Sequence, residues 1–199
     1  MPWWGFAITA PSCARNVTDP RRTLVAALLL LSAMAVTAQG ASAEQSEPQA
    51  AEPATRAGWR EIQLTDVRNG ESFTIGELND RPVILESFAV SCPVCTSQQR
   101  EIQALHARLG DAVVSVSLNT DPNEDAAYIR QHLARHGFDW PYAVSPPTLT
   151  RLLVAEFGNV ILNAPSAPVI LVCPGGQARL LNWGVKSADR LQQELQSCS

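Results

Sequence analysis

Apolar residues along this chain follow two spacings, and each spacing predicts one kind of element. Short apolar or alternating runs predict β-strands, whereas apolar residues three or four positions apart predict helices. The predicted strands cover 60–67, 73–75, 82–89, 112–118, 167–173 and 177–184, and the predicted helices cover 93–109, 121–137, 147–157 and 187–197. Strands that alternate with helices and end in a hairpin predict an α/β domain with a mixed central sheet and helices on both faces.

Turn and capping residues refine the bounds of these elements. Asn69-Gly70 separates the first two strands and predicts an N-terminal β-hairpin extension. Asp121 is the predicted N-cap of the second long helix, with Glu124 closing a capping box. Ser187 is the predicted N-cap of the last helix.

Residues 1–43 differ from the rest of the chain. Arg21 and Arg22 precede an uncharged apolar run over 23–38, and small residues at 41–43 follow it. This order is typical of a signal peptide, and the run is shorter than the roughly 20 residues that span a bilayer. We therefore expect cleavage and export to the periplasm or another extracytoplasmic space, with an uncleaved membrane anchor as the alternative.

Composition separates a linker from a folded domain and excludes one class of partner. Residues 44–58 are rich in Pro, Ala and Glu without apolar periodicity, which predicts a flexible linker before a domain over 59–199. The chain is 46% hydrophobic and 17% charged, a balance typical of a packed core. Its net charge is −4 and no basic stripe occurs, which argues against nucleic acid as a partner.

The cysteines carry the candidate chemistry. Cys13 lies in the predicted leader, so a mature chain keeps Cys92, Cys95, Cys173 and Cys198. The Cys92–Cys95 spacing at a predicted helix start places the two residues about 5–6 Å apart, as a disulfide requires. The helix N-terminus favours the thiolate of the first cysteine. The pair is therefore predicted to act as a redox-active disulfide that needs no further cofactor.

Two other uses of the pair are less favoured. A zinc site normally has a second Cys or His pair at similar spacing, and the sequence has none, so we expect no metal site. A structural bridge across four residues stabilises a fold by only about 2 kcal/mol in the chain-entropy model.

Two segments carry a resemblance to a known family. "VILESFAVSCPVCTSQQREI" resembles the active-site segment of the thioredoxin superfamily, and residues 59–89 resemble the lead-in of its exported TlpA/ResA-type branch, which includes the redoxins. The likeness extends from Trp59 to Leu195 and implies a thioredoxin-like fold for the predicted domain. It also implies disulfide exchange with protein clients, in which Cys92 attacks and Cys95 resolves the mixed disulfide.

The resemblance implies roles for several further residues. Pro168 is the expected cis-proline opposite the pair, where the backbone beside it, including Ala167, would pair with a client segment. Glu86 is the expected proton acceptor for Cys95, with solvent contact at the strand end as the bland alternative. Three residues are expected beside the client groove: Ser91, Pro93 and Val94. Ser91 departs from most relatives, which carry Trp.

The resemblance also places the last helix alongside the strand that contains Cys173. It therefore implies a structural Cys173–Cys198 disulfide, with one buried thiol and one free tail thiol as the alternative.

Several related activities fit this resemblance, and they differ in the direction of electron flow and in the partner. We favour a reductase that a membrane electron-transfer partner recharges. An oxidase or isomerase that matures a periplasmic enzyme is one alternative, and a copper-delivery module on the same fold is another. A peroxidase is disfavoured because Ala89 stands where peroxiredoxins carry Thr.

Overall fold

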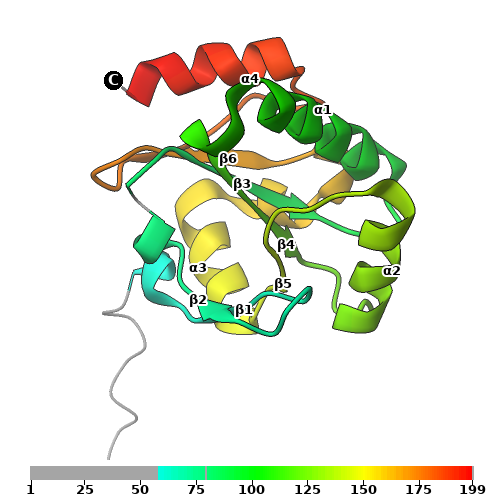
Figure 1. Cartoon of the computed structure of the whole chain (residues 1–199). Helices are drawn as coiled ribbons and strands as arrows, with labels where there is room; N and C mark the ends of the chain where they lie inside the picture. The colour runs from blue at the N-terminus through cyan, green and yellow to red at the C-terminus, as the bar shows by residue number, and fades with distance from the viewer. Residues whose placement is uncertain (1–57, 79, 199) are drawn as a thin grey trace, which may run out of the picture. The chain divides into compact units, whose positions relative to one another are not determined.

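The computed structural model describes residues 58–78 and 80–198 and shows a five-stranded sheet between layers of helices (Figure 1). The predicted signal peptide and nearly all of the predicted linker lie outside these residues. The strands are β1 Leu64–Thr65, β2 Ser72–Phe73, β3 Val83–Phe88, β4 Val114–Asn119, β5 Tyr142–Val144, β6 Val169–Val172 and β7 Ala178–Leu180. The α-helices are α1 Pro93–Leu109, α2 Ala126–His136, α3 Pro147–Phe157 and α4 Ala188–Leu195.

The sheet is mixed, with the strand order β5-β4-β3-β6-β7. β3, β4 and β5 are parallel and are joined through α1 and α2, whereas β6 is antiparallel to both β3 and β7. The N-terminal hairpin of β1 and β2 forms a separate two-stranded sheet. The predicted α/β class, mixed sheet and hairpin extension are confirmed.

Each face of the sheet has its own hydrophobic core. Side chains of α1, α2 and α4 pack with Ile84 and Phe88 of β3 on one face. Side chains of α3 and of the N-terminal hairpin pack with Val83 and Leu85 on the other. Every residue of β3 is buried, which explains why its sequence is nearly continuous in apolar residues instead of alternating.

The predicted N-cap of the second helix is wrong. α2 begins at Ala126, and the Asp125 carboxylate caps it by accepting the Tyr128 N–H over 2.8 Å. Asp121 instead accepts the Asn123 N–H over 2.9 Å and forms a turn ahead of the helix. The predicted capping box does not form either, because the Glu124 side chain bonds to Val90, Ser91 and Asn119 instead.

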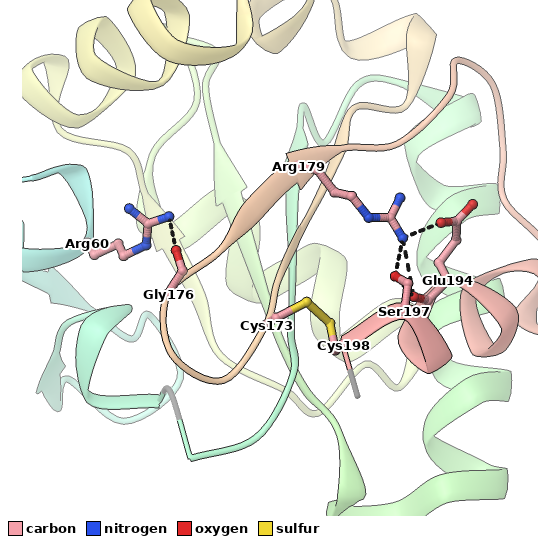
Figure 2. The surroundings of a disulfide bond; sticks show 7 residues. All are labelled: Arg60, Cys173, Gly176, Arg179, Glu194, Ser197 and Cys198. Atoms are coloured by element: carbon pink, nitrogen blue, oxygen red, sulfur yellow. Dashed lines mark hydrogen bonds and ion pairs between the residues drawn. A yellow bond between two sulfur atoms is a disulfide. The ribbon is translucent and has the colours of Figure 1, made fainter.

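The N-terminal strand is shorter than its alternation predicts. Trp59–Glu61 forms a 3₁₀ helix, and only Leu64–Thr65 pairs as β1. Contacts with distant segments hold this N-terminal segment to the rest of the domain. The Trp59 indole donates to Glu156 over 2.7 Å, and the Arg60 guanidinium donates to the Gly176 carbonyl over 2.6 Å (Figure 2). Side-chain anchoring therefore overrides local strand propensity here.

Candidate active site

Cys92 and Cys95 begin α1, directly after the central strand β3. Cys92 is the N-cap of the helix, and its Sγ accepts the Cys95 N–H over 3.3 Å. Pro93 occupies the first helical position, where its missing N–H costs nothing. Both cysteines are free thiols. Cys92 is 7% exposed and Cys95 is fully buried. The outer cysteine is thus the one that a client disulfide can reach.

Cys95 is held as a protonated thiol. Its Sγ lies 3.3 Å from the Ala164 carbonyl oxygen, to which the S–H donates. Burial, followed by the Cys92 side chain and the Glu86 carboxylate, raises the pKa of the Cys95 thiol far above its ordinary value. Cys95 therefore needs a nearby base before it can act as a nucleophile.

Glu86 is a fully buried carboxyl group in the middle of β3. Its Oε2 accepts hydrogen bonds from the Ser117 hydroxyl over 2.7 Å and from the Gln99 amide over 3.2 Å, while Oε1 has no partner among the described residues. Burial raises the pKa of Glu86 to about 8, against the opposing effects of these hydrogen bonds and of Lys186. The alternative in which this side chain reaches solvent does not fit zero exposure.

A buried polar chain extends from Glu86 to α2. Gln99 donates to Glu86, and the Gln99 Oε1 lies 2.7 Å from the His132 Nε2. Burial lowers the pKa of His132 to about 4, so its imidazole is neutral near pH 7 and donates through Nε2. No local sequence signal marks these partners, because they meet Glu86 only through the packing of α1 and α2 against the sheet.

The expected client-pairing positions, Ala167 and Pro168, are both buried. The Ala167 N–H donates to the Ala164 carbonyl over 2.8 Å, and its own carbonyl accepts the Lys186 ammonium group. Ala167 adopts the left-handed region, with a φ of 48°. Its backbone therefore has no free groups to offer a client. The isomer of the bond before Pro168 stays a prediction.

The exposed part of the loop before β6 lies three residues before Pro168, at Pro165. The Ala164 carbonyl meets the Cys95 thiol, and Pro165 is exposed beside the groove described below. The sequence pattern pointed to the proline next to the strand, whereas the structure places the "NAPS" segment at the thiols.

A groove of about 1020 Å³ lies beside Cys92. Ser91, Pro93 and Val94 line it, and their contact with a client stays a prediction. Two exposed apolar side chains, Val144 and Leu162, also line the groove. An apolar groove next to a reachable sulfur suits an extended polypeptide segment that carries a disulfide.

Cys173 and Cys198 form a disulfide that joins the end of β6 to the end of the chain (Figure 2). Their Cα atoms lie 5.1 Å apart. Val172 pairs with Val83 at the start of β3, whereas Cys92 follows the end of that strand. The two cysteine pairs therefore lie at opposite ends of the sheet, and the Cys173–Cys198 bond is separate from the candidate active site.

Comparison with known proteins assigns the chain to a family. The Redoxin family model matches residues 48–172, which is more than half of the chain. A secreted Mycobacterium tuberculosis disulfide oxidoreductase homologous to E. coli DsbE aligns with a TM-score of 0.55 and 15% identity, over 70% of this chain and 97% of that protein. A putative electron transfer protein from Aquifex aeolicus VF5 aligns with a TM-score of 0.57 and 21% identity, over 70% and 94% of the two chains.

A third similar structure is BsSco, a member of the Sco family of cytochrome c oxidase assembly proteins, with a TM-score of 0.56 and 16% identity, over 69% of this chain and 90% of that protein. At these identities the structural likenesses support the thioredoxin-like fold and no finer property. Within residues 58–78 and 80–198, no helix combines the length and apolarity that crossing a membrane requires.

Proposed function

Since the chain belongs to the Redoxin family and is a thiol–disulfide oxidoreductase, we propose that it reduces disulfides of protein clients outside the cytoplasm through Cys92 and Cys95. One observation carries this proposal: a Cys-x-x-Cys pair caps a helix beside an apolar groove, with Cys92 at the groove and Cys95 buried behind it.

The proposed reaction has two exchange steps. The Cys92 thiolate attacks one sulfur of the client disulfide, which forms a mixed disulfide and releases the other client sulfur as a thiolate. Cys95 then attacks the Cys92 sulfur, so that the Cys92–Cys95 disulfide forms and the second client thiolate leaves. Two electrons pass to the client, and the protein pair is oxidised.

Glu86 is the proposed acceptor of the Cys95 proton in the second step. Two observations support this role: burial brings the pKa of the Glu86 carboxyl to about 8, nearer to that of a thiol, and the negative Glu86 raises the pKa of Cys95. Transfer of the proton would generate the attacking thiolate at the moment it is needed.

Reduction is the favoured direction because Pro93 and Val94 supply no positive charge to the Cys92 thiolate. A pair whose thiolate is not strongly stabilised is not a strong oxidant. A membrane electron-transfer partner that recharges the pair, and export through the N-terminal leader, belong to the same proposal. The secreted relative in Mycobacterium tuberculosis is compatible with export.

Two other activities could use the same two cysteines, and a specific observation favours one of them. An oxidase that matures a periplasmic enzyme would use the same two cysteines in the opposite direction, and an isomerase would use them with no net transfer of electrons. A copper-delivery role has the Sco likeness in its favour. However, the described part of the chain contains no group of three His, Cys, Asp or Glu side chains arranged as metal ligands, so this site would offer copper only two thiols.

Exchange with a disulfide-linked model peptide tests the proposal. The Cys95→Ser variant should accumulate a mixed disulfide with the peptide on Cys92, detectable by mass spectrometry, while the wild type turns over. The Cys92→Ser variant is the matched control and should accumulate none. Equal adduct formation by both variants would contradict the assigned order of attack.

A further inference from the structure

Two peptide groups that immediately precede Cys92 are bonded to a single side chain, that of Glu124. The Val90 N–H donates to Glu124 Oε2 over 2.6 Å, and the Ser91 N–H donates to Oε1 over 2.9 Å. The Asn119 side-chain amide donates to Oε2 over 2.6 Å. Glu124 thus links the connection between β4 and α2 to the turn that presents Cys92.

All three partners of Glu124 are donors and both of its oxygens accept, which is the pattern of a carboxylate. Hydrogen bonds from N–H groups to a carboxylate are among the stronger ones in proteins. Glu124 is 8% exposed, and a buried charge of this kind is tolerated because each oxygen is satisfied. The carboxylate also lines the groove beside Cys92.

Helix capping does not account for this position. Asp125 is the cap of α2, and Glu124 precedes it in a turn in which the Glu124 N–H donates to the Asp121 carbonyl over 3.3 Å. The side chain therefore points away from its own helix and crosses to residues 33 and 34 positions earlier in the chain. A surface role would leave this acid in solvent, as it leaves Asp125.

The placement affects the stability of the Cys92 thiolate in two ways. A negative charge beside the start of α1 disfavours a second negative charge on the neighbouring sulfur. The carboxylate also accepts from the Val90 and Ser91 N–H groups, so these two donors are not available to that sulfur. Two other charged residues line the groove, Asp121 and Arg151. Their charges are opposite to each other, and both side chains are more exposed than Glu124.

We propose that Glu124 is a positioning residue of the redox site: it fixes the turn over 89–92 that presents Cys92 and keeps the Cys92–Cys95 disulfide reducing. This inference rests on the proposed exchange through Cys92 and Cys95. Disulfides whose reduced form is stabilised are stronger oxidants. Removal of the carboxylate should therefore make the pair a stronger oxidant.

The test compares Glu124→Gln with Asp125→Asn in the purified protein. Both changes remove one negative charge from adjacent positions, but only the first touches the turn before Cys92, and Asn remains a good N-cap. The measurement is the equilibrium of the Cys92–Cys95 disulfide with glutathione near pH 7, read by mass spectrometry of the alkylated peptide so that Cys173 and Cys198 do not contribute. The rate at which Cys92 is alkylated is the second readout.

Glu124→Gln should shift this equilibrium toward the dithiol by about fivefold or more and speed alkylation of Cys92, on the scale of one screened charge interaction. Asp125→Asn should change neither by more than about twofold, as expected for an exposed charge. Glu124→Asp keeps the charge but has a shorter side chain that reaches the Val90 and Ser91 N–H groups less well, so a smaller shift in the same direction is expected. This variant replaces Glu124→Gln in the test if the Gln variant does not fold.

An equilibrium in the Glu124 variants that matches Asp125→Asn would overturn the inference, even if their melting temperatures fall, because a merely structural contact changes stability alone. If the wild type forms no reversible Cys92–Cys95 disulfide with glutathione, the proposed exchange function itself fails. If the wild type equilibrates with glutathione and the Glu124 variants have the same equilibrium, the inference about Glu124 fails and the proposed exchange function stands.

Discussion

Gln99 donates a hydrogen bond to the Glu86 carboxylate over 3.2 Å, and His132 fixes the amide in the orientation that allows it. The Gln99 oxygen faces the His132 Nε2, so its nitrogen faces Glu86. Glu86 is thereby held inside the core with one oxygen satisfied and the other free of partners among the described residues. This arrangement suits a group that gains and loses a proton during a reaction cycle.

Glu86→Gln should slow resolution of the mixed disulfide by Cys95. The amide keeps an acceptor for Ser117 but cannot take a proton, and loss of a positioned base typically costs a factor of about 100 or more. The measurement is the release of a model peptide from Cys92 between pH 6 and pH 9. Wild-type release should rise as Glu86 ionises near its pKa of about 8, and the variant should lack this rise.

Identical pH profiles for the wild type and Glu86→Gln would remove Glu86 from the mechanism. Glu156→Gln is a suitable control, because Glu156 accepts the Trp59 indole N–H and belongs to the packing of the domain, away from the thiols.

The same carboxyl group should make the folded state less stable as pH rises. The folded pKa of about 8 lies above the ordinary value of 4.5, so the folded state binds more protons than the unfolded state between these values. Stability contributed by the protonated form is present below about pH 4.5 and is lost as pH rises toward about 8. Urea unfolding at several pH values should show this decline in the wild type and a flatter profile in Glu86→Gln.

Several elements could be predicted from local patterns, whereas contacts at long sequence separation could not. The strand Val83–Phe88 could be predicted from its apolar run. The helix Pro93–Leu109 could be predicted from a proline in its first turn and a glycine at its end. Tyr142–Val144 was missed as a strand because three residues show no periodicity. Its Tyr142 side chain is fully buried in the core.

The residues of the candidate site show the same contrast between local patterns and long-range contacts. Cys92 and Cys95 are recognisable because their chemistry depends on spacing within one helical turn. Glu124 was predicted only to close a capping box, because its three partners, Val90, Ser91 and Asn119, lie before α1 and at the end of β4. Trp183 is 76% exposed, and no feature of its local sequence distinguishes a covered from an uncovered indole.

Lys186 should be important for the loop that precedes β6. It is the only lysine in the sequence, it is buried, and its ammonium donates to the Ala167 and Gly184 carbonyls. Lys186→Met should destabilise the protein by about 1–3 kcal/mol, because both carbonyls lose a charged partner. Hydrogen exchange should locate increased opening at residues 164–167; unchanged protection there would contradict the assigned contact.

Loss of the Cys173–Cys198 disulfide should lower stability without changing redox activity. The bond closes a loop with a sequence separation of 25, worth about 3.5 kcal/mol in the chain-entropy model. A Cys173→Ser/Cys198→Ser variant should unfold at lower urea concentration yet exchange with the model peptide at the wild-type rate. A large loss of exchange in the folded variant would show that the two cysteine pairs are coupled.

The most direct test of the central claim is a Cys95→Ser trap in the native host. Without its resolving cysteine, the protein should accumulate extracytoplasmic clients as mixed disulfides on Cys92, which reducing agents release and which mass spectrometry can identify. The Cys92→Ser/Cys95→Ser variant should trap none, and the redox state of each client in cells that lack the protein would give the direction of electron flow. We predict defined client adducts on Cys92, with clients that become oxidised when the protein is absent; a Cys95→Ser variant that captures nothing beyond the double variant would contradict the account.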